Sequence, residues 1–269
     1  MTTLSSTFDK LSTELAGALV ACRADPGSRA VHSLRIAVRR VEALLHAMTE
    51  DHPRDERLRA DTQWALRQLK NVRRAAGPVR DLDVQRKLIA EVTAKAAPSR
   101  SVKPLKSFEV EAKRLDKRLR RQRRKLAKKL TSAVRRAEPK LERSLGELAE
   151  TMAGWHPLSL LNTARRLVLR SSLHLEDASP EALHVYRKQA KAARYLAEME
   201  TASAPARRLA KWLKRVLDAI GRWHDLLLLA QEAKTVLGKQ SRLVEAIRQE
   251  RERAWKVAVR STASGRPTP

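Results

Sequence analysis

The segment VHSLRIAVRR, residues 31–40, places one histidine among three arginines in a pattern that could bind an anion. His32, Arg35 and Arg39 are spaced at i, i+3 and i+7, so on a helix they lie within about 60° of one another. Guanidinium and imidazolium groups donate strong hydrogen bonds to phosphate and carboxylate oxygens. Like charges on one face repel unless an anion or neighbouring carboxylates neutralise them.

The same spacing recurs about 150 residues later, in LHVYRKQAKAARY, residues 183–195. There His184, Arg187 and Lys191 take the places of the first histidine and its two arginines. A lone stripe of this kind is usually a solvated helix face, whereas two copies in matching order favour an anion-binding site. Further cations adjoin the two stripes, namely Arg40, Lys188 and Arg194.

A second pair of helices adds cations in the same way. Arg67, Lys70 and Arg74 lie on one helical face, opposite an apolar stripe. Lys211 and Lys214 align with the first two of these residues in the second half of the chain. We therefore expect all five side chains to contribute to the anion site.

The middle of the chain is its most basic part. Residues 103–143 hold 17 Lys and Arg against 5 Asp and Glu. Leucines at helical spacing continue through this run, which predicts a packed amphipathic helix with one cationic face. A regular ladder of cations suits a linear, evenly charged polymer, and arginine forks suit bidentate phosphate contacts. The ladder comprises Arg114, Arg118, Arg121, Lys125 and Lys128.

Two aspartates follow glycines that we expect to end helices. Asp81 comes after Gly77, and Asp225 comes after Gly221. Each aspartate is either an ordinary helix N-terminal capping residue or a carboxylate that orients a cation of the basic site.

The segment EVEAK, residues 109–113, spells the ExExK motif of triphosphate tunnel enzymes, which requires a β-strand. On a helix Glu109 and Glu111 lie about 160° apart and do not converge on a metal. We interpret the match as a coincidence, and we expect neither a metal site nor a cofactor.

The elements that position these residues are predicted to be helices throughout. Apolar residues recur at helical spacing, as in Phe8, Leu11, Leu15 and Leu19, and strand-like alternation is missing. Short loops between such helices favour antiparallel bundles. Proline and glycine predict about ten helices, with breaks at Pro26–Gly27, Pro53, Gly77–Pro78, Pro98–Pro104, Pro139, Trp155–Pro157, Pro180, Pro205, Gly221 and Gly238.

The order of motifs also repeats. The segment LKNVRRAAGPVRDLDV, residues 69–84, matches LKRVLDAIGRWHDLLL, residues 213–228, at an offset of 144 residues, close to the 152 of the histidine stripes. Two related bundles packed about a pseudo-two-fold axis would explain this repeat. We place the first bundle at about residues 5–100 and the second at about 104–260, followed by a disordered tail, 261–269.

Charge limits the possible partners. The 269 residues include 57 Lys and Arg against 30 Asp and Glu, a formal net charge of +27. Such an excess favours a polyanionic partner. The single cysteine, Cys22, cannot form a disulfide within the chain, which is consistent with a reducing compartment. Its place in an apolar stripe predicts a small core residue. The N-terminal residues lack the pattern of a signal peptide, and no apolar run is long enough to span a membrane, so we expect a cytoplasmic protein.

Taken in order, HSLRIAVRRVEALL, GPVRDLDV, the basic middle helix, LHVYRKQAKAARYLAEM and IGRWHDLLLL resemble the CHAD domain, the conserved histidine α-helical domain. The similarity covers about residues 5–260. It implies two antiparallel four-helix bundles with approximate two-fold symmetry and a basic surface that binds inorganic polyphosphate. It also implies association with polyphosphate granules.

The resemblance assigns anion binding to the two histidine stripes, with the basic middle helix beside them. The sequence departs from the family pattern at Ala192, where a cation is often found, and at His224, which aligns with Arg80 of the first half.

Three alternatives to polyphosphate binding stay open. Non-specific binding to the phosphates of DNA or RNA is the first of these, although the chain has few aromatic residues on which bases could stack. A histidine phosphotransfer protein is the second, and an all-α scaffold with incidental charge is the third. No nucleophile, acid–base carboxylate pair or phosphate-binding glycine loop is evident, so we expect a protein without catalytic activity. The sequence does not indicate the oligomeric state.

Overall fold

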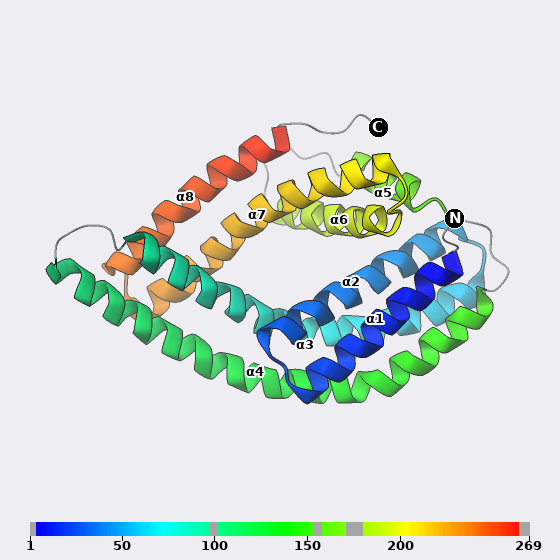
Figure 1. Ribbon diagram of the computed structural model, residues 1–269, viewed down its shortest axis with the longest axis horizontal. Coiled ribbons are helices and arrows are strands. Elements are labelled where there is room, and N and C mark those ends of the chain that lie inside the picture. Colours follow the sequence, from blue (N-terminus) through cyan, green and yellow to red (C-terminus); the bar gives the residue numbers. More distant parts are fainter. Residues whose placement is uncertain (1–3, 97–101, 153–157, 171–179, 264–269) are drawn as a thin grey trace. The chain divides into compact units, whose positions relative to one another are not determined.

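The computed structural model describes residues 4–96, 102–152, 158–170 and 180–263. Within these ranges every regular element is an α-helix, which confirms the all-α prediction (Figure 1). None of the helices in the described ranges has an apolar stretch long enough to cross a membrane. The helices are α1 (Leu4–Ala24), α2 (Ser28–Asp51), α3 (Glu56–Ala96), α4 (Val102–Thr151), α5 (Leu160–Leu169), α6 (Pro180–Met199), α7 (Ala204–Leu237) and α8 (Arg242–Ala263).

The described ranges contain eight helices instead of about ten, because three of the predicted breaks do not occur. Gly77–Pro78 lies inside α3, Pro139 lies inside α4, and Gly221 lies inside α7. The break predicted at Trp155–Pro157 falls outside the described residues, as does the part of Pro98–Pro104 before Val102. Helix α8 continues to Ala263, so the first three residues of the predicted disordered tail are helical.

The helices tolerate these prolines because both are on the solvent side. Pro78 and Pro139 are exposed, and so are Arg74 and Arg135, the residues four positions earlier. A proline inside a helix leaves the carbonyl of residue i−4 without its hydrogen bond, and an exposed carbonyl can bond to water instead. Buried apolar stripes before and after each proline then keep the helix continuous.

The chain forms two compact units, and each is built from segments that are distant in the sequence. Unit 1 comprises the described residues up to Gly77 together with Ala127–Lys214. Unit 2 comprises Pro78–Leu126 and the described residues from Arg215 onward. This division does not follow the consecutive halves 5–100 and 104–260, because α3, α4 and α7 each contribute residues to both units.

Unit 1 has a core made by amphipathic helices. Helix α1 lies beside α2, which also packs on α6, and α6 in turn packs on α5 (Figure 1). The stripe predicted in α1 is confirmed, since Phe8 and Leu15 are each only 1% exposed. Cys22 is fully buried in the same stripe, as expected for a small core residue.

Unit 2 has a separate core formed by its parts of α3, α4, α7 and α8. Phe108 and Leu115 of α4 pack with Leu226 of α7 and Leu243 of α8 in one buried cluster. Polar contacts also join these helices. The Glu111 carboxylate accepts hydrogen bonds from the Ser241 hydroxyl, at 2.9 Å, and from the Leu243 amide, at 3.0 Å. Glu111 therefore caps α8, and EVEAK lies on a helix, as the rejection of the tunnel-enzyme motif required.

A buried ion pair joins α3 to α4 within unit 2. Arg123 donates from Nε to Asp83 Oδ1 at 2.5 Å and from Nη2 to Oδ2 at 3.2 Å, and the Asp83 side chain is 5% exposed. Removal of one partner from such a pair leaves a buried charge without compensation. We expect Asp83→Asn to lower the free energy of unfolding by about 3 kcal/mol, measured by chemical denaturation. The exposed Asp25 of unit 1 offers a control, because Asp25→Asn removes the same charge from the protein surface. Equal losses in the two variants would contradict the prediction.

Candidate functional site

A cavity in unit 1 gathers cationic side chains from three helices. It has a volume of about 490 Å³ and is lined by α2, α3 and α6. Its described lining residues include six cationic side chains and one carboxylate, which give a formal charge of +5 with the histidine and the tyrosine neutral. The charged and titratable residues among them are Arg39, Glu42, His46, Arg67, Lys70, Arg73, Lys188, Lys191 and Tyr195. We call this site the unit 1 cavity.

The amphipathic pattern of α2 explains how its residues reach the cavity. Val38, Val41 and Leu45 are buried in the core, with exposures of 0–1%. Arg39 and His46 are spaced by seven residues and therefore lie on one side of α2, at the cavity. The apolar face thus anchors the helix in the core and leaves the polar face free to line the cavity.

Glu42 is the carboxylate that holds the α2 and α3 walls together. It is only 8% exposed. Its Oε1 accepts a hydrogen bond from Arg73 Nε at 2.9 Å, and its Oε2 lies 3.4 Å from Arg39 Nη1. A charged pair in this setting needs such hydrogen bonds to offset its desolvation. Glu42 therefore orients two of the six cations and compensates part of their charge.

Burial and neighbouring positive charge shift the pKa values of Arg39 and His46 in the cavity. Burial lowers the pKa of Arg39 and the neighbouring guanidiniums of Arg73 and Arg35 lower it further, against the attraction of Glu42. Arginine nonetheless stays cationic at any physiological pH. The pKa of His46 is also lowered, first by burial and then by Lys188 and Arg73, while Glu42 opposes the shift. His46 is therefore neutral at neutral pH in the free protein.

The structure brings five of the residues predicted from the sequence into this cavity. They come from both halves of the predicted repeat: Arg39 from the first stripe, Arg67 and Lys70 from α3, and Lys188 and Lys191 from the second stripe. Ala192, where the family pattern often has a cation, also lines the cavity. A cationic side chain at position 192 would therefore lie at this cavity.

Other predicted residues of unit 1 are not among the described lining residues. His32, Arg74, Lys128, Lys211 and Lys214 are exposed on their helices. Arg187 on α6 is half-buried and is not among the described lining residues of the cavity. The side chain of His184 lies outside the described residues. The roles predicted for these residues stay predictions.

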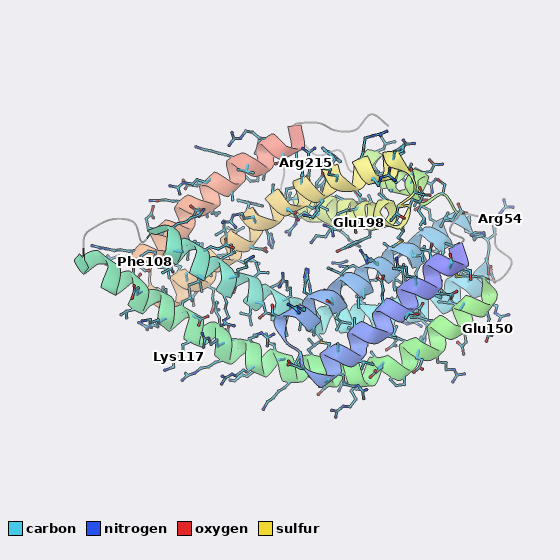
Figure 2. The ribbon with its side chains drawn as sticks, viewed as in Figure 1. Arg54, Phe108, Lys117, Glu150, Glu198 and Arg215 are labelled. Carbon is cyan, nitrogen blue, oxygen red and sulfur yellow. The ribbon has the colours of Figure 1, made fainter. Side chains whose placement is uncertain are left out.

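Arg40 and Arg194 have acidic partners. Arg40 Nη1 lies 3.1 Å from Glu14 of α1, and its Nη2 lies 3.7 Å from Glu198 of α6 (labelled in Figure 2). Arg194 Nε lies 3.3 Å from the same Glu198, and its guanidinium carbon sits 4.7 Å from the centre of the Tyr195 ring. Arg40 thus joins α2 to both α1 and α6, whereas the two Arg194 contacts lie within α6.

Gly77 was predicted to end a helix, but it lies inside α3 beside the side chain of Arg35. A Cβ atom at this position would lie 3.1 Å from Arg35 Nη1. The glycine therefore lets the Arg35 guanidinium pass close to α3.

The capping alternative for the two aspartates is wrong, because Asp81 lies within α3 and Asp225 lies within α7, not at helix N-termini. The orienting alternative stays a prediction. Asp225 Oδ1 lies 3.9 Å from Nδ1 of the adjacent His224.

Unit 2 contains a second basic hollow, of about 610 Å³, along the predicted cationic ladder of α4. Four of the five predicted ladder residues line it, with Lys117 added. Thr235 and Val236 of α7 form the opposite wall. We call it the α4–α7 groove, and its cations are Arg114, Lys117, Arg118, Arg121 and Lys125.

The sequence contains a signal for three cavity residues that lie beyond the predicted stripes. The spacing that relates His32, Arg35 and Arg39 continues to Glu42 and His46, at i+10 and i+14. Extending the stripe by these two steps would have found them both. Arg73 follows Lys70 at i+3 and could have been found in the same way.

Comparison with known proteins agrees with this architecture. The family model of the CHAD domain matches residues 3–234. A crystal structure of the CHAD domain from the plant Ricinus communis is similar to the chain with a TM-score of 0.59, covering 98% of this chain and 91% of that one at 17% sequence identity. At that identity the likeness shows the fold. No curated protein matches the chain. Since the family match extends over most of the chain and includes every residue of the unit 1 cavity, the chain belongs to the CHAD domain family.

Proposed function

We propose that the protein binds inorganic polyphosphate in the unit 1 cavity and does so without catalysis. The observation that carries the proposal is the convergence of six cationic side chains from α2, α3 and α6 on one cavity, whose described lining residues include a single carboxylate. The CHAD resemblance implies the same ligand. A chain of linked phosphates can contact many cations at once. Its binding does not require a protein surface that recognises nucleic-acid bases.

The arrangement of the cations supports a polyanion over a single small anion. Lys70 and Lys188 are exposed, whereas Arg39 and Arg73 are partly buried beside Glu42. The cavity therefore presents donors that range from partly buried guanidiniums paired with Glu42 to exposed ammonium groups. Arginine forks can hold individual phosphates bidentately, and lysines supply less directional charge.

Binding of this kind would serve to target or organise polyphosphate granules in the cytoplasm, as the resemblance implies. The phosphate backbone of a nucleic acid would compete for the same cations. Recognition of single strands relies on aromatic side chains on which bases stack, and Tyr195, the aromatic residue at the cavity, is only 7% exposed. The geometry therefore disfavours single-stranded nucleic acid, whereas duplex DNA and structured RNA stay the competing ligands.

A competition titration tests this function. Labelled long-chain polyphosphate is bound at near-physiological salt and displaced by unlabelled polyphosphate, duplex DNA or structured RNA. We expect polyphosphate to compete at much lower phosphate concentration than either nucleic acid. Equal competition per phosphate would replace the proposal with generic polyanion binding, and failure of polyphosphate to bind would overturn it.

Protonation of His46 should couple polyphosphate affinity to pH. The histidine faces Glu42 on its own helix, Arg73 of α3 and Lys188 of α6, and its pKa is lowered in the free protein. A bound anion raises that pKa, so binding takes up a proton and affinity increases as pH falls from the ordinary histidine value of 6.5 toward the lowered value. The gain is at most about tenfold per pH unit for one proton.

Titrations across this pH range with the wild type and His46→Gln provide the measurement. The variant should lose most of the pH dependence and retain its affinity at mildly alkaline pH. His52→Gln is the matched control, because His52 directly follows α2 and is not among the described lining residues of the cavity. A pH dependence that persists in His46→Gln would contradict the assignment.

A further inference from the structure

We propose that the α4–α7 groove of unit 2 is a second, autonomous oligophosphate site, so that one chain offers two independent places for a phosphate chain. The inference rests on the proposed function for the kind of ligand. The site itself is argued from residues of unit 2 alone.

The groove presents cations without carboxylates among its described lining residues. Five cationic side chains line it, all of them exposed. Arg114, Arg121 and Lys125 recur at helical spacing on one side of α4. Arg114 and Lys125 are eleven positions apart, which corresponds to about 16 Å along the helix axis. This length can accommodate several consecutive phosphates of one chain.

Among the described residues, few carboxylates compensate the charge in the groove. Arg118 is the exception, since its Nε lies 3.0 Å from Glu232 of α7, and its side chain remains 52% exposed. Like charges at i+3 and i+4 on a helix destabilise it unless a counterion is bound. A linear anion that bridges these cations would remove that repulsion. The lysine labelled in Figure 2, Lys117, marks the exposed edge of α4 along which such an anion would lie.

The walls of the groove are held in place by contacts inside unit 2. Arg118 and Glu232 join α4 to α7, and Arg86 Nε lies 2.6 Å from Asp116, joining α3 to α4. Beneath α4, Leu115 and Leu119 are fully buried in the unit 2 core. The cationic stripe is therefore positioned by the fold of its own unit, and its geometry does not depend on an occupied unit 1 cavity.

Two sites make the binding stoichiometry depend on chain length. A short oligophosphate such as tripolyphosphate should bind twice per protein chain. A long polyphosphate that engages both sites gains avidity from the second contact without any new interaction.

Isothermal titration calorimetry with tripolyphosphate tests the inference on the full chain. The groove variant combines Arg114→Gln, Arg121→Gln and Lys125→Gln. Its control combines Lys113→Gln, Arg124→Gln and Arg242→Gln, which remove the same charge from exposed positions of unit 2 that do not line the groove. We expect two bound molecules for the wild type and the control, and one for the groove variant. The groove variant should also bind long polyphosphate more weakly, with a shallower salt dependence.

The outcomes separate the groove from the proposed function. If the groove variant binds as many tripolyphosphate molecules as the wild type, the second site is overturned and the unit 1 cavity is unaffected. If instead a variant with a neutralised unit 1 cavity binds as many as the wild type, the cavity assignment fails and the groove stands. Circular dichroism of each variant ensures that a lost site does not reflect an unfolded chain.

Discussion

We expect binding of long polyphosphate to weaken by about a hundredfold when four cations of the unit 1 cavity are neutralised together, as Arg67→Gln, Lys70→Gln, Lys188→Gln and Lys191→Gln. The figure corresponds to about 0.7 kcal/mol per cation, which is modest because exposed charges are screened by solvent and salt. Arg67, Lys70 and Lys188 are exposed, and Lys191 is half-buried. The loss should be accompanied by a shallower dependence of affinity on salt, because fewer counterions are released on binding.

A matched control separates the cavity from the overall charge of the protein. Lys10, Lys129, Arg135 and Lys140 are exposed cations of unit 1 that are not among the described lining residues, and they also comprise three lysines and one arginine. Their fourfold glutamine variant has the same net charge as the cavity variant. We expect it to lose only a few-fold in affinity, through the weaker long-range field. If the two variants lose the same affinity in fluorescence titrations, net charge and not the cavity determines binding.

Replacement of Glu42 with glutamine has opposite effects on stability and on binding. The carboxylate is buried beside Arg39 and Arg73, so its loss leaves two partly buried guanidiniums without their anion. We expect the free energy of unfolding to fall by about 2 kcal/mol, less than for a fully buried pair because both arginine side chains keep 28–29% of their exposure. Polyphosphate affinity should rise, because the formal charge of the cavity increases by one and both guanidiniums can turn to phosphate oxygens.

Thermal unfolding with and without polyphosphate measures both effects of Glu42→Gln. The variant should unfold at a lower temperature than the wild type in the free state and gain more stability from the ligand, since a ligand that binds only the folded state stabilises it according to its affinity. Glu142→Gln is the control, because Glu142 is an exposed carboxylate of α4 in unit 1. Weaker binding by Glu42→Gln would show instead that the carboxylate holds the arginines in the orientation that binding requires.

The continuity of the helices shows where local sequence signals were sufficient. The signals at Pro53 and Gly238 ended helices as predicted, and Gly238 has the positive φ of 87° that favours glycine. Gly77–Pro78 did not end a helix, because the proline lies on the solvent side and apolar residues on both sides of it pack into cores. Tertiary packing decided between these cases, and the local dipeptide does not encode it.

The sequence by itself determined that the protein is helical, strongly cationic and equipped with repeated stripes of histidine, arginine and lysine. It did so because helical periodicity and charge are local properties of the chain. Only the tertiary structure decided which cations share a site. It placed Arg39 in the same cavity as Lys188 and Lys191, which lie about 150 residues away in the sequence. It also placed most of the α4 ladder in the other unit. The tertiary structure also buries the Glu42 carboxylate of α2 beside Arg73 of α3. Spacing along one helix cannot reveal this contact, because it joins two helices.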